Sequence, residues 1–131
     1  MSKKRPTISD LLNTLDRVVS GLRTILKSTS ATGDQLAQVT AHFDSRIDQV
    51  FQKKRQINEA LSLYRKTIPT RKTPFAADVL EHLRELRDDH GWDHMHAESP
   101  SAKSACTKEI KRLWGMTEAL QFAIKTKDML S

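Results

Sequence analysis

The apolar side chains between residues 8 and 27 recur at intervals of three, four and seven residues, and this spacing limits what the segment can form. Such intervals place side chains on one face of an α-helix, whereas a half-buried strand needs alternation at every second residue. Thr7 and Asp10 have the spacing of a capping box, in which each side chain accepts the other residue's backbone N–H. We therefore expect a helix over residues 8–27. Its apolar face consists of Ile8, Leu11, Leu12, Leu15, Val18, Val19, Leu22, Ile25 and Leu26.

A second helical pattern extends over residues 33–67. Thr32 can cap this helix and Gln35 can reach back toward the cap, while Pro69 forces the residue before it out of helical geometry. At a rise of about 1.5 Å per residue the helix is roughly 50 Å long. Its apolar stripe is narrower than that of residues 8–27 and resembles the seam of a coiled coil.

Two more helices are expected in the C-terminal half of the chain. The first covers residues 74–90, because Pro74 suits the first turn of a helix and Gly91 favours its end. The second covers about residues 100–128 and begins with a similar pair of a capping serine and a proline. Gly115 within it either weakens the helix or lets another helix approach closely. No run of β-branched residues alternates with polar ones, so no strand is predicted.

Four amphipathic helices joined by short connections predict an all-α fold, and more narrowly an elongated, antiparallel (up-down-up-down) four-helix bundle with a long second helix. The 131 residues are expected to form a single helical domain, with a basic and flexible N-terminus over residues 1–6. Because the second and fourth predicted helices are longer than the other two, they should overhang them. Bare apolar stripes on the overhanging parts predict self-association or docking on another protein.

The composition argues against several classes of protein. The chain has one cysteine, Cys106, so it cannot be a secreted scaffold held together by internal disulfides. No apolar run approaches the roughly 20 residues of a transmembrane helix, and no apolar segment of a secretory signal follows the basic N-terminus. We therefore expect a cytoplasmic or nuclear protein that is not secreted. No motif indicates a cofactor or a small-molecule substrate.

The formal net charge of +6 is distributed unevenly along the chain. Residues 51–73 contain seven basic side chains and one acidic one, whereas residues 74–98 contain two basic and seven acidic ones. One interpretation of the basic block is a surface that binds nucleic-acid phosphates or an acidic partner. The other is a solvated face that the acidic block neutralises, since an antiparallel second and third helix would lie side by side. The basic residues are Lys53, Lys54, Arg55, Arg65, Lys66, Arg71 and Lys72.

Residues 88–98, DDHGWDHMHAE, contain three of the five histidines and four carboxylates. A metal site is one interpretation, because histidine nitrogens and carboxylates bind zinc. Gly91 is expected to end the helix inside the cluster, which counts against that interpretation. The favoured interpretation is a polar connection between the third and fourth helices, with Trp92 packed against the end of the bundle. The nitrogen ligands of the weaker metal interpretation are His90, His94 and His96.

An arginine and a histidine in and beside this cluster form a spaced pair. Arg87 is followed by the polar Asp88 and, after six intervening residues, by His94. This pattern resembles the motif of the HEPN ribonuclease superfamily, whose members are small helical bundles. The resemblance implies a composite site of two protomers that cleaves RNA without metal. In such a site Arg87 stabilises phosphate charge and His94 acts as general acid or base.

The amphipathic helices favour a non-enzymatic interaction or assembly protein, which acts through exposed apolar stripes as an oligomer or as an accessory subunit of a larger complex. A HEPN-like ribonuclease that uses Arg87 and His94 is the first alternative. A basic accessory protein that binds nucleic acid is the second.

Overall fold

The computed structural model of this chain describes residues 5–69 and 72–130, and these ranges contain four α-helices. The all-α prediction is therefore confirmed for the part of the chain that the structure describes. Of the expected flexible segment over residues 1–6, only the last two residues lie within the described part. The helices are α1 (Ile8–Lys27), α2 (Gly33–Thr67), α3 (Ala76–Met95) and α4 (Pro100–Leu130).

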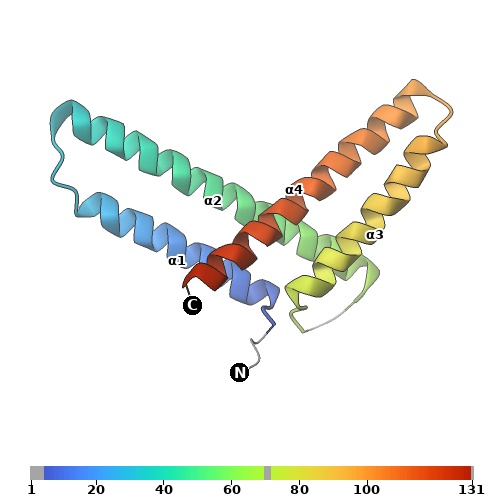
Figure 1. Ribbon diagram of the computed structural model, residues 1–131, viewed down its shortest axis with the longest axis horizontal. Helices are drawn as coiled ribbons and strands as arrows, with labels where there is room; N and C mark the ends of the chain where they lie inside the picture. The colour runs from blue at the N-terminus through green and yellow to red at the C-terminus, as the bar shows by residue number, and fades with distance from the viewer. Residues whose placement is uncertain (1–4, 70–71, 131) are drawn as a thin grey trace.

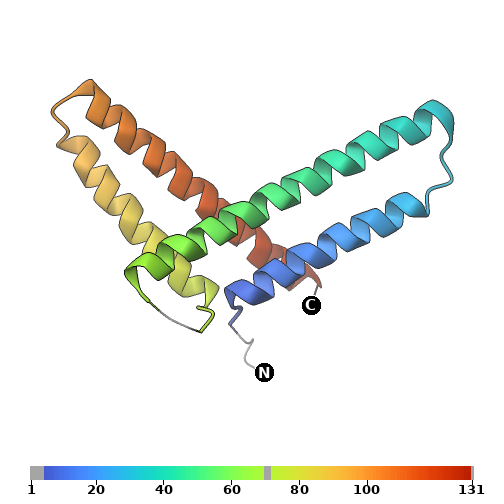
Figure 2. The same ribbon diagram turned by 180° about the vertical axis from the view of Figure 1, so that it is seen from behind.

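The four helices are arranged as two hairpins that cross (Figure 1). α1 and α2 form one hairpin, α3 and α4 form the other, and the two diverge from the crossing toward their connecting loops (Figure 2). Contacts between the hairpins join α2 to α4, α1 to α4 and α2 to α3. Since the hairpins do not share one axis, the finer prediction of a single up-down-up-down bundle is not confirmed.

The buried core lies where the hairpins cross. It is built from residues 8–19 of α1, 47–64 of α2, 76–83 of α3 and 113–123 of α4. The long helices therefore bury part of their extra length against each other, whereas Phe122, Met129 and Leu130 toward the end of α4 remain 38%, 77% and 49% exposed. Fully buried members of this core include Ile8, Leu11, Leu15, Ile57, Leu83, Leu113, Met116 and Leu120.

Beyond the crossing, each hairpin continues as an arm without a core of its own. We call residues 20–46 the first arm and residues 84–112 the second arm. No residue in either range is buried. Each arm consists of two helices that shield only the face between them, so apolar side chains near the tips remain in water. Ile25 in the first arm is 58% exposed and Trp92 in the second is 60% exposed.

The helix starts are determined by local hydrogen bonds in two cases and by backbone geometry in a third. The predicted capping box is present, since the Thr7 hydroxyl accepts from the Asp10 N–H at 3.2 Å and the Asp10 carboxylate accepts from the Thr7 N–H at 2.9 Å. The Ser99 hydroxyl accepts a backbone N–H from the first turn of α4. Thr32 is the N-cap residue of α2, as predicted, but its side chain makes no capping hydrogen bond. The chain instead enters α2 through a φ of 60° at Gly33, which glycine adopts without strain.

The end of α3 differs from the prediction. The helix was expected over residues 74–90, but it begins at Ala76 and passes through Gly91 to Met95. Glycine inside a helix costs only about 1 kcal/mol relative to alanine, and the packing of α3 along α4 offsets that cost. A glycine therefore permits a helix to end without forcing it to do so. α4 likewise continues to Leu130, slightly beyond the predicted residue 128.

Candidate functional site

The histidine cluster lies at the tip of the second arm. α3 is continuous through Gly91, so His90 and His94 lie on one uninterrupted helix. The break that was expected between them at Gly91 is absent. His96 stacks on Trp92, with ring centroids 3.9 Å apart and ring planes at 22°, and its Nδ1 lies 2.9 Å from the Trp92 carbonyl oxygen. Within residues 5–69 and 72–130, no group of three or more His, Cys, Asp or Glu side chains is placed to hold a metal ion. The metal interpretation of the cluster therefore gains no support.

The predicted packing of Trp92 against the end of the bundle was wrong. Trp92 is 60% exposed and Met95, one turn further along α3, is 79% exposed. The physical reason is the continuation of α3, which carries both side chains out to a tip where no core exists to receive them. Instead of closing a bundle, these side chains form an exposed apolar surface beside the stacked His96 ring.

Arg87 lies on the inner side of the second hairpin, next to the crossing. Its guanidinium carbon stands 4.0 Å from the centre of the Trp114 ring, a cation–π distance. The same guanidinium donates a hydrogen bond of 2.5 Å to the hydroxyl of the buried Thr117, which in turn donates to the Leu113 carbonyl at 2.9 Å. Arg87 thus links α3 to α4 at the edge of the core.

His94 lies seven residues after Arg87 on the same helix, which places the two about 10 Å apart along its axis. One chain alone does not bring them onto a single phosphate group. A composite ribonuclease site would need a second copy, as the family resemblance implies. The contacts of Arg87 with Trp114 and Thr117 favour a structural role for the arginine in the single chain.

Two cations of the predicted basic surface are used in contacts within the chain. The Lys53 ammonium stands 4.8 Å from the centre of the Phe122 ring of α4. Lys54 forms an ion pair with Asp16 of α1. Both side chains are only partly exposed, so they are less available to an external phosphate than the sequence alone indicates.

The other members of the basic block are distributed over the second half of α2 and the segment that follows it. Arg55, Arg65, Lys66 and Lys72 are exposed, whereas Arg71 lies outside the described residues. Of its exposed cations, Arg55 and Lys66 line crevices between α2 and α4.

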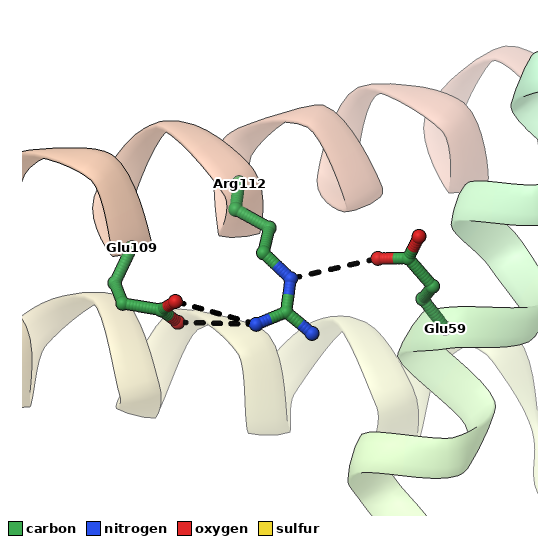
Figure 3. Close-up of polar contacts among 3 residues, drawn as sticks. All are labelled: Glu59, Glu109 and Arg112. Atoms are coloured by element: carbon green, nitrogen blue, oxygen red, sulfur yellow. Dashed lines mark hydrogen bonds and ion pairs between the residues drawn. The ribbon is translucent and has the colours of Figure 1, made fainter.

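A polar cleft where α2 crosses α4 was not predicted. Arg112 of α4 places its Nε 3.5 Å from the carboxylate of Glu59 on α2 and its Nη1 3.3 Å from that of Glu109 (Figure 3). Gly115, one turn further along α4, allows the close approach that its sequence position suggested. A Cβ at Gly115 would lie 2.8 Å from the amide nitrogen of Gln56 on α2. Two adjoining crevices of about 530 and 350 Å³ flank these contacts.

Cations from both helices line this cleft. Arg55 and Lys66 come from α2, and Lys111 and Arg112 come from α4. When charge is counted in blocks along the sequence, Arg55 and Lys66 fall in the basic segment of residues 51–73. Lys111 and Arg112 lie outside that segment and are not connected with it. The crossing of the hairpins brings the two pairs together, and no local sequence pattern reports that crossing.

No family model, curated protein or solved structure matches this chain. Among the described residues, no helix is both long enough and apolar enough to cross a lipid bilayer. The candidate sites therefore depend on the geometry and chemistry of the residues themselves.

Proposed function

We propose that this protein is a non-enzymatic interaction protein that binds a protein partner, or a second copy of itself, through the tips of its two arms. The observation that supports this proposal is the exposure of large apolar side chains where no core covers them. At the tip of the second arm these are Trp92 and Met95, at 60% and 79% exposure. Near the tip of the first arm they are Ile25 and Leu36, at 58% and 39%.

Exposed apolar side chains at these positions suit an interface. Burying a large apolar side chain contributes about 1.5–3 kcal/mol. Tryptophan is among the residues that most often dominate the energy of a protein interface. Trp92 is also held in place by its stacking on His96, so less side-chain entropy is lost when a partner binds.

The arrangement of the arms supports an assembly or accessory role. The two loops that end the hairpins lie at opposite sides of the molecule (Figure 1). Two separate apolar tips on one rigid crossing can engage two partners, or two sites on one partner. We expect such partners in the cytoplasm or the nucleus.

The contacts of Arg87 support this proposal over the ribonuclease alternative. Its guanidinium is engaged by Trp114 and Thr117, which explains its presence without a catalytic role. In an RNA cleavage assay we expect the wild type and the His94→Ala variant to be equally inactive. Cleavage that disappears in His94→Ala would establish the ribonuclease instead.

A paired substitution at the second tip tests the proposal. The variant Trp92→Ser/Met95→Ser removes the apolar surface, and Asp89→Ser/Asp93→Ser is a control because it changes two exposed polar residues of the same helix. Size-exclusion chromatography with light scattering measures self-association, and quantitative co-purification from the native host measures partner binding. We expect the first variant to weaken one of these by about tenfold, equivalent to 1.4 kcal/mol, and the control to leave both unchanged. A wild type that stays monomeric and recovers the same proteins as the tip variant would contradict the proposal.

A further inference from the structure

The cleft between α2 and α4 has the features of a binding site that is separate from the arm tips. We define it by its four cations, Arg55, Lys66, Lys111 and Arg112, which line its two adjoining crevices. Both crevices share Arg55, Glu59 and Arg112, so they form one continuous depression along the crossing. Their volumes of about 350 and 530 Å³ leave room for a ligand of more than one chemical group.

Most of the positive charge in this cleft is available to a ligand. Arg55, Lys66 and Lys111 are exposed and form no ion pair or hydrogen bond with another described residue. Arg112 uses its Nε and Nη1 toward Glu59 and Glu109, and its Nη2 contacts neither carboxylate (Figure 3). Glu59 is the carboxylate that lines both crevices, and it is already paired with Arg112, as is Glu109 of α4.

The two α2 cations of the cleft lie on a line along the helix axis. Arg55 and Lys66 are eleven residues apart on α2, which is about 16 Å along the helix axis. A duplex carries one charge on each strand for about every 3.4 Å of its axis, so this line spans several phosphates. A single phosphate group would instead favour cations gathered around one point. The spacing thus indicates an elongated anion.

The remaining lining residues indicate the class of that anion. Gln52, Gln56, Asn58 and Ser62 supply amide and hydroxyl donors, which together with arginine and lysine are the usual contacts to phosphate oxygens. Leu63 and the buried Met116 are the apolar members, and no aromatic ring lines either crevice. An acidic protein segment would usually need an apolar or aromatic anchor at the centre of its interface.

We propose that the α2–α4 cleft binds the phosphodiester backbone of a nucleic acid without reading its bases. The absence of aromatic rings among the lining residues removes the stacking on which single-strand specificity often depends. Affinity then comes from neutralised phosphates, is similar for different sequences and falls steeply with salt. This surface is distinct from the arm tips, so a chain that binds both would hold a nucleic acid beside a protein partner.

A double substitution in the cleft, compared with a matched one outside it, tests this proposal. Arg55→Ala/Lys111→Ala removes two unpaired cations of the cleft. Arg17→Ala/Lys125→Ala removes one arginine and one lysine that are exposed and line neither crevice, so the net charge changes equally. Fluorescence anisotropy measures the binding of labelled oligouridylate and of a labelled DNA duplex, each about 20 nucleotides long, at roughly 50–200 mM salt.

We expect the wild type to bind both probes at the lowest salt concentration. The cleft variant should bind at least about tenfold more weakly, and the control should change by less than about twofold. The slope of log K against log salt concentration for the duplex should also fall by about 1.8 in the cleft variant, since each neutralised phosphate contributes about 0.9. Trp92→Ser/Met95→Ser should bind the probes like the wild type, which separates this test from that of the arm tips.

Three results would overturn the proposal. The first is equal weakening in the cleft variant and the control, which would mean a diffuse effect of net charge. The second is no measurable binding of either probe by the wild type at the lowest salt concentration. The third is displacement of the probes by polyglutamate at equal charge concentration, which would identify an acidic protein segment as the ligand. Because Arg55 and Lys111 are exposed and unpaired, folding of the variant should be preserved, and circular dichroism checks this.

Discussion

The crossing and the arms are built from the same four helices, yet their surroundings differ sharply. At the crossing, side chains such as Leu120 and Ile57 are fully buried among all four helices. In the arms, residues 20–46 and 84–112 contain no buried side chain. Helices of this length gain most of their stability from tertiary packing. The difference indicates that the crossing holds the fold and that the arms contribute little to its core.

The same truncation made in both regions tests this division most strongly. Leu120 is fully buried at the crossing, and Leu36 is 39% exposed in the first arm. We expect Leu120→Ala to lower the free energy of unfolding by about 2–5 kcal/mol, because it leaves a cavity in the core. Leu36→Ala should lower it by less than about 1 kcal/mol, since part of that side chain is already in water. Denaturant unfolding followed by circular dichroism measures both, and equal losses would abolish the distinction.

Two arginines of α3 sharpen the boundary between the regions. Arg87→Ala removes the cation–π contact with Trp114 and the hydrogen bond to Thr117, so we expect a loss of about 1–2 kcal/mol in the free energy of unfolding. Arg84→Ala, one turn earlier, removes only an exposed pair with Glu81 at 3.8 Å and should cost less than about 0.5 kcal/mol. Similar losses at both positions in thermal unfolding would show that Arg87 does not link α3 to α4.

Alanine substitutions at two glycines within helices are expected to have the smallest effects on the free energy of unfolding. No atom lies within 4 Å of a Cβ built at Gly91 in the second arm, so Gly91→Ala should raise the free energy of unfolding by about 0.4–1 kcal/mol. At the crossing, a Cβ on Gly115 would lie 2.8 Å from the Gln56 amide nitrogen, and that side chain must shift. We therefore expect a smaller gain, or a small loss, for Gly115→Ala. A larger gain at Gly115 than at Gly91 would mean that α4 is not closely packed on α2.

Much of the fold could be predicted because the signals are local. The apolar spacing and the Thr7–Asp10 box determine α1, and Pro69 lies directly after the residue that caps the end of α2. The end of α3 could not be predicted from Gly91, because a cost of about 1 kcal/mol is small beside the packing of one helix on another. The crossing itself depends on contacts between residues far apart in the chain, which periodicity does not report.

The candidate sites could be predicted only in part, for the same reason. Trp92 was recognised as a notable residue, but its exposure follows from the continuation of α3 and not from its neighbours in sequence. Arg55 and Lys66 belong to a visible basic block, whereas Lys111 joins them only through the crossing. Local chemistry was therefore visible in the sequence, and its combination into surfaces was not.

Hydrogen–deuterium exchange of the isolated chain, resolved by segment with mass spectrometry, tests the central distinction most directly. Amides that open only on global unfolding exchange slowly, and those in weakly packed regions exchange through local opening. We predict slow exchange in residues 47–64 and 113–123, which contribute to the buried core. We predict much faster exchange in residues 20–46 and 84–112, which contain no buried side chain. Equal protection of the arms and the crossing in a monomeric chain would contradict the account.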